Sequence, residues 1–180
     1  MRFMVFALLL IGACGSPPRE RFYTLDAPEP PVAADGAPSI AVGPVTVPEL
    51  VDRPQLVVRL GANQVALEEQ ARWAEPLRGA IARVVAANLA AALGARVVGQ
   101  RNGDPDYRVT LDVQRFESTP GEAVLIDAAW SVVPKAGERR SGRSLAREKP
   151  QGKDYDALAA AHSAALAAIS RDIAATLAKP

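Results

Sequence analysis

Apolar residues recur every three or four positions in two long segments of the chain, and this spacing predicts two amphipathic helices. The first helix is predicted over residues 76–93, because Pro76 suits a first helical turn and Gly94 suits a left-handed cap. The second is predicted over residues 154–178. Its apolar face carries Tyr155, Leu158, His162, Ala165, Leu166, Ile169, Ile173 and Leu177.

Alternating apolar and polar residues predict several short strands with one wet face. In residues 107–113, for example, valine and leucine alternate with arginine, threonine and aspartate. Strands are predicted at 21–25, 39–47, 55–60, 64–67, 96–98, 107–113, 123–133 and 143–147, the last at a sheet edge. The order of strands, helix, strands and helix favours an α/β fold: a two-layer sandwich of a mostly antiparallel sheet with both long helices on one face.

The first residues of the chain are typical of a bacterial lipoprotein signal. Arg2 is followed by a short apolar run, and Gly12 and Ala13 precede Cys14, which is the only cysteine. In the lipoprotein signals that this segment resembles, the cysteine thiol receives a diacylglyceryl group, cleavage occurs just before it, and the new amine is acylated. An ordinary cleavable signal or a buried N-terminal helix is the alternative. Gly15 and Ser16 follow the cysteine without an aspartate, which favours the outer membrane in bacteria that use that sorting rule.

This interpretation divides the chain into a signal peptide at 1–13, a lipidated tether at 14–20 and a single domain at 21–180, with a proline-rich loop at 27–38. A tether from Cys14 to Phe22 reaches at most roughly 28 Å when extended, so the domain is expected to stay close to its membrane. Cleavage leaves 20 basic and 20 acidic residues. A balance near zero argues against nucleic acid as a partner, because such binding needs a clustered basic surface.

Candidate catalytic and metal-binding groups are few. His162 is the only histidine, and it lies on the apolar face of a predicted helix, so we expect a core histidine. Asp104 and Asp106 are expected to form an ordinary turn, although a calcium pair is conceivable. Glu68 and Glu69 are expected at a solvated start of the first helix. We expect no catalytic residue, no metal and no cofactor apart from the covalent lipid on Cys14.

One basic stretch, which includes Lys135, Arg139, Arg140, Arg143, Arg147 and Lys149, admits two interpretations. A solvated hairpin turn is favoured. Contact with anionic lipid headgroups near the anchor is the alternative.

Three motifs stand in a fixed order along the chain: Ala-Val-Gly-Pro-Val-Thr-Val-Pro at 41–48, Asp-Arg-Pro-Gln at 52–55 and Arg-Trp-Ala-Glu-Pro-Leu at 72–77. Together with Phe-Tyr-Thr-Leu at 22–25, they resemble the signature of the ABC-type transport auxiliary lipoproteins, the PqiC-like family. The resemblance implies a non-enzymatic, periplasm-facing lipoprotein of the outer membrane. It also implies work with an MCE-domain protein and inner-membrane transport components to move lipid or another hydrophobic solute. The chain has no Walker motif, so ATP hydrolysis would belong to a partner.

The signature residues are the candidate interface. They are Asp52, Arg53, Pro54, Arg72, Trp73 and Glu75. The sharper hypothesis places Arg53, Arg72 and Trp73 at a contact with another protomer or with the MCE protein, because arginine and tryptophan are enriched among interface hot spots. The alternative is structural: the prolines end strands, and Arg72 and Trp73 fasten the start of the first helix to the sheet.

The short tether suggests a docking collar at the outer-membrane end of such a transporter, and a ring-like homo-oligomer is one form for it. An assembly or plug lipoprotein for an outer-membrane β-barrel is the alternative function. A lipid carrier with its own cavity comes third, and an anchored hydrolase is a distant fourth.

Overall fold

The computed structural model describes residues 19–29, 32–99 and 104–177. The predictions for the signal peptide, for Cys14 and for most of the tether therefore lie outside the described residues. The elements along the chain are β1 (Arg21–Tyr23), β2 (Ser39–Thr46), β3 (Gln55–Gly61), β4 (Gln64–Trp73), α1 (Leu77–Leu93), β5 (Arg96–Val97), β6 (Tyr107–Thr119), β7 (Ala123–Pro134), β8 (Arg140–Glu148) and α2 (Tyr155–Leu177).

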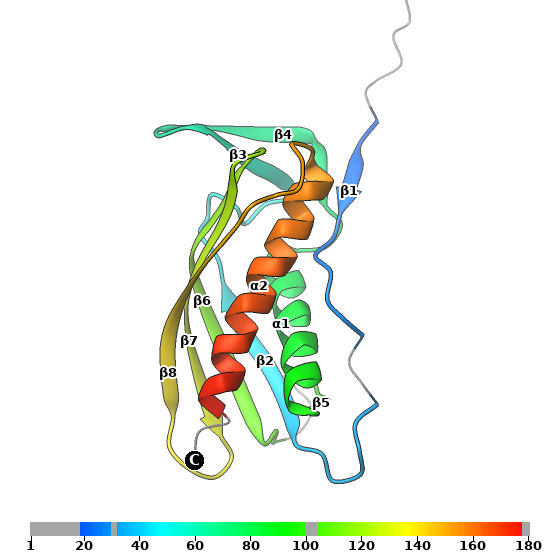
Figure 1. The fold of residues 1–180 in the computed structure, drawn as a ribbon, viewed down its shortest axis with the longest axis vertical. Coiled ribbons are helices and arrows are strands. Elements are labelled where there is room, and N and C mark those ends of the chain that lie inside the picture. Colours follow the sequence, from blue (N-terminus) through cyan, green and yellow to red (C-terminus); the bar gives the residue numbers. More distant parts are fainter. Residues whose placement is uncertain (1–18, 30–31, 100–103, 178–180) are drawn as a thin grey trace, which may run out of the picture.

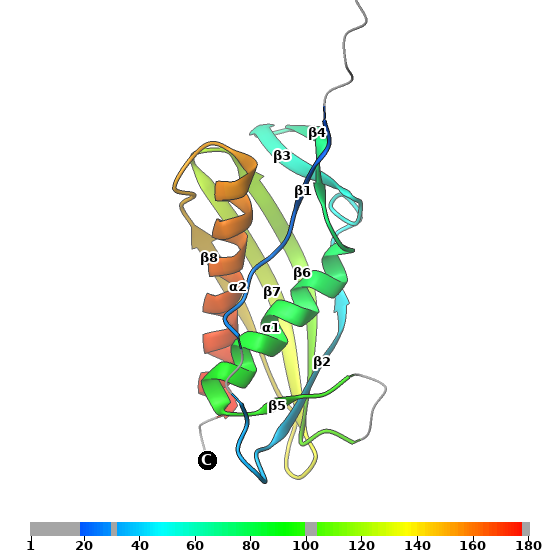
Figure 2. The same ribbon diagram turned by 90° about the vertical axis from the view of Figure 1, so that its right-hand side faces the viewer.

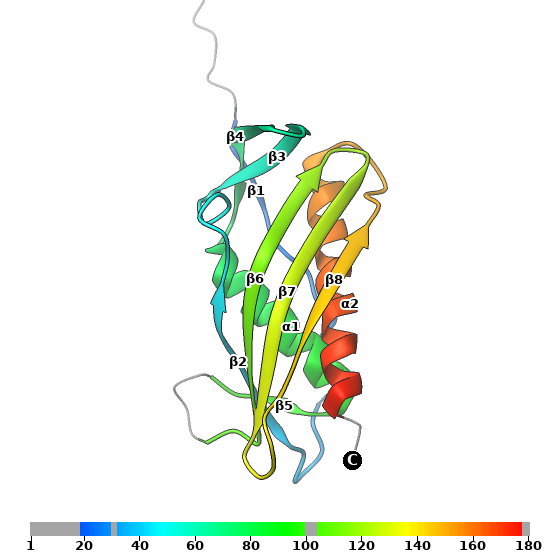
Figure 3. The same cartoon turned by 90° about the vertical axis from the view of Figure 1, so that its left-hand side faces the viewer.

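A five-stranded sheet in the order β5-β2-β6-β7-β8 forms one layer of the molecule. Figure 2 shows α1 and α2 in front of this sheet, and Figure 3 shows the sheet in front of both helices, so the two helices cover the same face. Val109, Leu111 and Val113 on β6 are buried and alternate with exposed or half-buried residues of the outer face. The fold is mixed α/β with both helices on one side, which confirms the predicted class.

A second sheet, in the order β1-β4-β3, was not predicted. It lies at one end of the long axis, as Figure 1 shows. The pairing is also less antiparallel than expected, because β2 runs parallel to β5 and β6, and β1 runs parallel to β4. The long pairs β6–β7 and β7–β8 are antiparallel, and β8 occupies the predicted edge.

Helix α1 ends as its sequence indicates, with Gly94 in the left-handed conformation at φ 61° and its N–H donating to the carbonyl of Ala90. Strand β4 is longer than the predicted strand at 64–67 and continues to Trp73. Glu68 and Glu69 therefore lie in β4, so the expectation that they begin the first helix was wrong. Their alternation with apolar neighbours is interrupted where the β3–β4 register shifts between Gln55 and Leu56, and this irregularity hid the strand.

The connection from β1 to β2 crosses the outer side of the helix layer, as Figure 2 shows. Its Leu25 is 1% exposed and belongs to the same hydrophobic core as the two helices and both sheets. Ser163 on α2 accepts the N–H of Asp26 at 2.9 Å, and Arg83 on α1 donates to the carbonyl of Leu25 at 2.8 Å. The described part of residues 27–38 contains a turn and no helix or strand.

Candidate functional site

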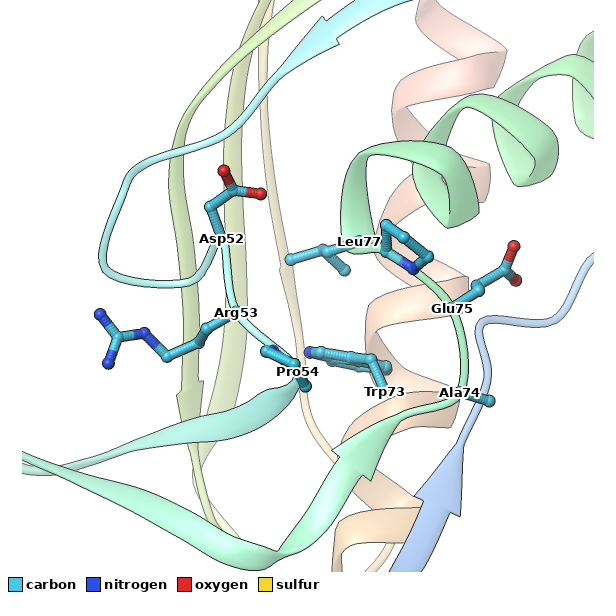
Figure 4. A pocket seen from close by; sticks show the side chains of 8 residues that line it. Asp52, Arg53, Pro54, Trp73, Ala74, Glu75 and Leu77 are labelled. Atoms are coloured by element: carbon cyan, nitrogen blue, oxygen red, sulfur yellow. The ribbon is translucent and has the colours of Figure 1, made fainter.

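A pocket of about 290 Å³ opens where the β2–β3 connection meets the end of β4 and the start of α1. Five of the six candidate residues line it, together with Ala74, Pro76 and Leu77. Figure 4 shows Trp73 and Leu77 facing the β2–β3 connection, with Glu75 on the opposite side from Asp52. The structure thus brings together the second and third motifs of the sequence, which are far apart along the chain.

Local backbone contacts build this junction. After β2, the N–H groups of Val51 and Asp52 donate to the carbonyl of Pro48 at 3.0 and 3.2 Å, which curls the connection into a tight turn. The carbonyl of Pro54 then accepts the N–H of Trp73 at 2.7 Å. Pro76 directly precedes α1, where its missing N–H leaves no donor unpaired. Pro48 and Pro54 flank the β2–β3 connection that frames the pocket, whereas Pro44, which was expected at a strand end, lies within β2.

Both carboxylates at the pocket are paired with arginines of α1. Asp52 accepts a hydrogen bond from Arg78, and Glu75 accepts two from Arg83, at 2.6 Å from Nη2 and 3.2 Å from Nε. The same Nη2 of Arg83 also reaches the carbonyl of Leu25. These ion pairs lie near the surface, so each contributes up to about 1 kcal/mol to stability. Their larger effect is electrostatic, because each arginine balances the negative charge of the carboxylate that it pairs with at the pocket.

Arg53 is the one basic residue that lines the pocket, and its guanidinium has a different environment. Its Nε is buried and makes no hydrogen bond within the described part of the chain. Figure 4 shows its side chain extending away from Trp73 and Leu77, with the guanidinium at the rim. A guanidinium carries five N–H donors, so the terminal nitrogens of this half-buried arginine can bind a carboxylate or a carbonyl from outside, although the buried Nε cannot.

Trp73 belongs both to the pocket lining and to the hydrophobic core. Its side chain lines the pocket, yet the residue is only 7% exposed. The indole makes edge contacts with the rings of Phe116 and His162, both at centroid distances of 6.1 Å. Trp73 is thus a core residue with one side at the pocket.

Arg72 points away from the pocket. Its Nη2 lies 3.0 Å from the carboxylate of Glu20, and its Nε donates to the carbonyl of Glu69. In the parallel pair of β1 and β4, Arg72 is opposite Phe22, whereas Trp73 is opposite Tyr23. The alternation of side chains along β4 therefore separates Arg72 from its neighbour Trp73. Arg72 fastens the segment before β1 to the small sheet.

Sequence reasoning missed Arg78 and Arg83, which hold the two acids. Both are exposed residues of α1, five positions apart, and they resemble ordinary solvated arginines in the sequence. The predicted helix was the available signal. Its first turns follow the third motif directly, so basic residues in those turns could have been expected near Asp52 and Glu75.

His162 lies in the core, as expected. It is fully buried, its ring stacks on Phe116 at 3.9 Å, and its Nε2 is 2.8 Å from the Ser118 hydroxyl. Burial lowers the pKa of His162 from 6.5 to about 3, so the ring is neutral at physiological pH. The neighbouring Ser163 hydroxyl instead donates to the carbonyl of Ala159, and the two residues form no nucleophile and base pair.

Asp104 and Asp106 do not converge on a common site. Asp106 accepts the N–H and the hydroxyl of Ser39, each at 2.7 Å, and these bonds lower its pKa. Asp104 lies 3.4 Å from Lys135. Asp106 therefore joins the start of β2 to the start of β6, and it bonds a distant residue rather than its own turn. Within the described ranges, no three histidine, cysteine or acidic residues are grouped so that they could hold a metal ion.

The basic stretch is divided between the two ends of the molecule. Lys135, Arg139 and Arg140 flank the β7–β8 connection, which Figures 1 and 3 place at the end opposite β1. That position favours a solvated hairpin turn for these three residues. Arg143 and Arg147 lie along β8, and Lys149 follows β8 at the other end. No helix within the described ranges is long and apolar enough to cross a bilayer.

Comparison with known proteins gives one family. The model of the ABC-type transport auxiliary lipoprotein component matches residues 23–174. No protein with a curated description matches the chain.

Three solved structures are similar to this one. A crystal structure of an uncharacterised protein has a TM-score of 0.76 at 22% identity, covering 89% of this chain and 99% of that chain. A Xanthomonas campestris protein has a TM-score of 0.65 at 21% identity, covering 87% of this chain and 92% of that chain. Both likenesses concern the fold alone. A PelC dodecamer from Paraburkholderia phytofirmans has a TM-score of 0.46 at 12% identity, covering 79% of this chain and 92% of that chain, which is too low to indicate how this chain assembles.

Proposed function

This chain belongs to the ABC-type transport auxiliary lipoprotein family, and from that premise we propose that it is a non-enzymatic docking component of an intermembrane transport system. In this proposal, Cys14 carries the lipid, the outer membrane holds the anchor, and the folded domain faces the periplasm. An MCE-domain protein, linked to inner-membrane transport components, docks on the domain. The cargo is lipid or another hydrophobic solute, and hydrolysis of ATP takes place in a partner.

The observation that carries this proposal is the pocket that gathers the signature residues. Its apolar floor is formed by Trp73 and Leu77, and its two acids are already paired with arginines of α1. Arg53 lines the same pocket with its guanidinium directed away from this floor, and its Nε makes no hydrogen bond among the described residues. The chemistry fits a partner segment that inserts an apolar side chain and offers a carboxylate or a backbone carbonyl to Arg53.

The short tether supports docking rather than shuttling. A domain held within tens of ångströms of one membrane cannot cross the periplasm, so the partner must reach it. Several copies around one partner would present equivalent pockets, and we include a ring-like homo-oligomer in the proposal.

The test is a binding measurement between the lipidated mature protein in detergent and a purified MCE-domain protein from the same organism. The Arg53→Ala variant is expected to weaken binding by about tenfold or more, because truncation of a hot-spot residue costs about 2 kcal/mol or more and each 1.4 kcal/mol is tenfold in affinity. Arg171→Ala removes an exposed arginine of α2 and serves as the matched control, with unchanged affinity. Circular dichroism confirms that each variant folds. Equal binding of wild type and Arg53→Ala would reject the pocket as the docking site.

Trp73 cannot serve as the primary probe, because its indole belongs to the core. Trp73→Ala is expected to lower stability by about 3–5 kcal/mol, so a loss of binding in that variant would have two causes. Affinity purification from crosslinked envelopes then separates the two proposed classes of partner. Recovery of an MCE-domain protein supports the transport role, and recovery of an outer-membrane barrel supports the assembly role instead.

A further inference from the structure

Exposed apolar side chains are concentrated in the small sheet. Within the described ranges, eight large hydrophobic residues are exposed, and four of them are in β1, β3 and β4: Phe22, Leu60, Val65 and Leu67. Leu60 is 58% exposed and Leu67 is 41% exposed. Nearer the body of the protein, Leu56 and Val58 on β3 are each only 2% exposed. Along β3, the apolar exposure therefore begins where the β3–β4 hairpin leaves the body of the protein.

The hairpin tip carries no charge. Residues 60–67 read Leu-Gly-Ala-Asn-Gln-Val-Ala-Leu, and Arg59 and Glu68, which flank them, are both engaged. Arg59 forms an ion pair with Glu117 on β6 at 3.1 Å, and Glu68 hydrogen-bonds the hydroxyl of Tyr155. The turn carries the polar residues Asn63 and Gln64 but no charge, whereas exposed edge strands such as β3 are commonly protected by charged side chains.

Three of the exposed apolar side chains lie on this two-stranded ribbon. Val65 is opposite Arg59 in the β3–β4 register, and Leu67 is opposite Val57, so Val65 and Leu67 share one face. Leu60 lies where the register shifts between Arg59 and Gly61, beside the turn.

The hairpin lies at the end of the molecule from which the N-terminal chain leaves. All three ribbon views show β3 and β4 beside the start of β1 at one end of the long axis (Figures 1, 2 and 3). Cys14 precedes Arg19 by five residues, so an extended chain brings the anchor within about 18 Å of Arg19. A lipid on Cys14 thus holds this end of the domain against the bilayer. This step rests on the anchor in the proposed function.

Basic residues accompany the hairpin at this end. Arg19 and Arg21 flank the start of β1, and the β8–α2 connection, which Figure 1 places at the same end, contains Lys149 and Lys153. Two nearby acids are engaged: Glu20 pairs with Arg72, and Asp154 accepts the N–H of Ala157 at the start of α2. Apolar side chains flanked by cations suit a surface with acyl chains below anionic headgroups.

We propose that the β3–β4 hairpin, residues 60–67, inserts its uncharged tip into the headgroup region of the phospholipid bilayer that holds the anchor. The hairpin then forms a second contact besides the lipid on Cys14. Together they fix the tilt of the domain on the membrane, so the pocket at the start of α1 is presented in a constant direction.

The test places a fluorophore on the hairpin of the lipidated full-length mature protein. Because the Cys14 thiol is acylated, Leu60→Cys or Ala62→Cys introduces the only free thiol for an environment-sensitive dye. The protein is reconstituted into vesicles of phosphatidylethanolamine and phosphatidylglycerol, with or without lipids that bear a nitroxide near the headgroup. Glu138→Cys, in the exposed β7–β8 connection at the other end, is the matched control.

Dyes at positions 60 and 62 are expected to show blue-shifted emission and a strong loss of intensity with nitroxide lipid. The dye at position 138 is expected to show neither change. Equal quenching at 62 and 138 overturns the proposal. So does blue-shifted emission without quenching, because it indicates that a second copy of the chain covers the hairpin. Mass spectrometry of the N-terminal peptide distinguishes a failure of the proposed anchor from a failure of the hairpin inference alone. An unmodified Cys14 overturns the anchor and this inference together, and a modified Cys14 with unquenched dyes overturns this inference alone.

Discussion

His162 is the clearest case of a single residue whose environment fixes its chemistry. The ring is fully buried between Phe116 and Trp73, and burial lowers its pKa to about 3. The unfolded chain binds a proton near pH 6.5, whereas the folded chain does so only near pH 3. The contribution of His162 to the free energy of unfolding is therefore fully present above pH 6.5. It is lost progressively as the pH falls towards 3.

We expect the free energy of unfolding to fall by about 2–3 kcal/mol between pH 6.5 and pH 4.5, since each pH unit contributes about 1.4 kcal/mol. Urea denaturation at several pH values measures this slope. His162→Gln retains a polar side chain for Ser118 and removes the titration, so its slope should be nearly flat in this window. Asp106, Glu117 and Asp127 have pKa values lowered from 3.8, 4.5 and 3.8, so they add only a small slope at the lower edge of this window, and they add it equally in wild type and variant. Equal slopes in wild type and variant would contradict the assignment.

Two glycines offer a matched test of packing. A Cβ on Gly142 would lie 2.5 Å from Cζ2 of the buried Trp130, whereas a Cβ on Gly79 in α1 would meet nothing within 4 Å. Gly142→Ala must displace the indole and its 3.1 Å hydrogen bond to Ser144, so we expect a loss of about 1–3 kcal/mol. Gly79→Ala favours the helix and should gain about 0.5–1 kcal/mol. Thermal denaturation that showed the same sign for both variants would contradict this packing.

At the scale of elements, β8 is held to β7 by a bidentate ion pair. Arg143 donates from Nε to Oδ1 of Asp127 at 2.7 Å and from Nη2 to Oδ2 at 2.6 Å, and these bonds lower the pKa of Asp127. The aspartate is only 4% exposed, so loss of the arginine leaves a buried carboxylate without this partner.

Arg143→Ala is expected to lower stability by about 1–3 kcal/mol. Arg147→Ala, on the same strand and on the same side by alternation, should change stability by less than about 0.5 kcal/mol. Urea denaturation at pH 7 checks both. The difference between the variants should also shrink as the pH falls below the ordinary value of 3.8 towards the lowered pKa of Asp127, because protonation removes the charge of the carboxylate. Equal destabilisation by both variants would show that the Arg143–Asp127 ion pair stabilises the edge strand no more than an ordinary exposed arginine does.

Local patterns predicted the helices and most strands, because each is decided by residues close in sequence. The spacing at 76–93 and the cap at Gly94 correspond to α1, and the alternation at 107–113 lies within β6. The division into two sheets was not predictable in the same way. The parallel pairing of β2 with β6, and the bonds from Asp106 to Ser39, join segments 67 residues apart and leave no periodic signal.

The site was predictable only in part. Motif order grouped Asp52 to Pro54 with Trp73 and Glu75, and the structure places these five on one pocket. The direction of Arg72 depends on its register against β1, which the sequence does not reveal. The burial of Trp73 depends on ring contacts from β6 and α2, two distant elements.

For the whole molecule, the proposed function makes the lipid on Cys14 the feature that determines where docking can occur. Cys14→Ser is expected to leave an unlipidated protein that no longer fractionates with the outer membrane, because no acyl chain then holds it. Fractionation of wild type and variant on a sucrose gradient measures this. Unchanged fractionation of the variant would remove the anchor from the account.

The central claim is that the pocket beside Arg53 docks a transport partner. The most direct measurement replaces Arg53 with a photo-crosslinking amino acid in cells that produce the lipidated protein, with the same replacement at Arg171 on α2 as the control. The account predicts that illumination joins position 53, and not position 171, to an MCE-domain protein. Capture of an outer-membrane barrel at position 53, or equal capture of the MCE-domain protein at both positions, would contradict it.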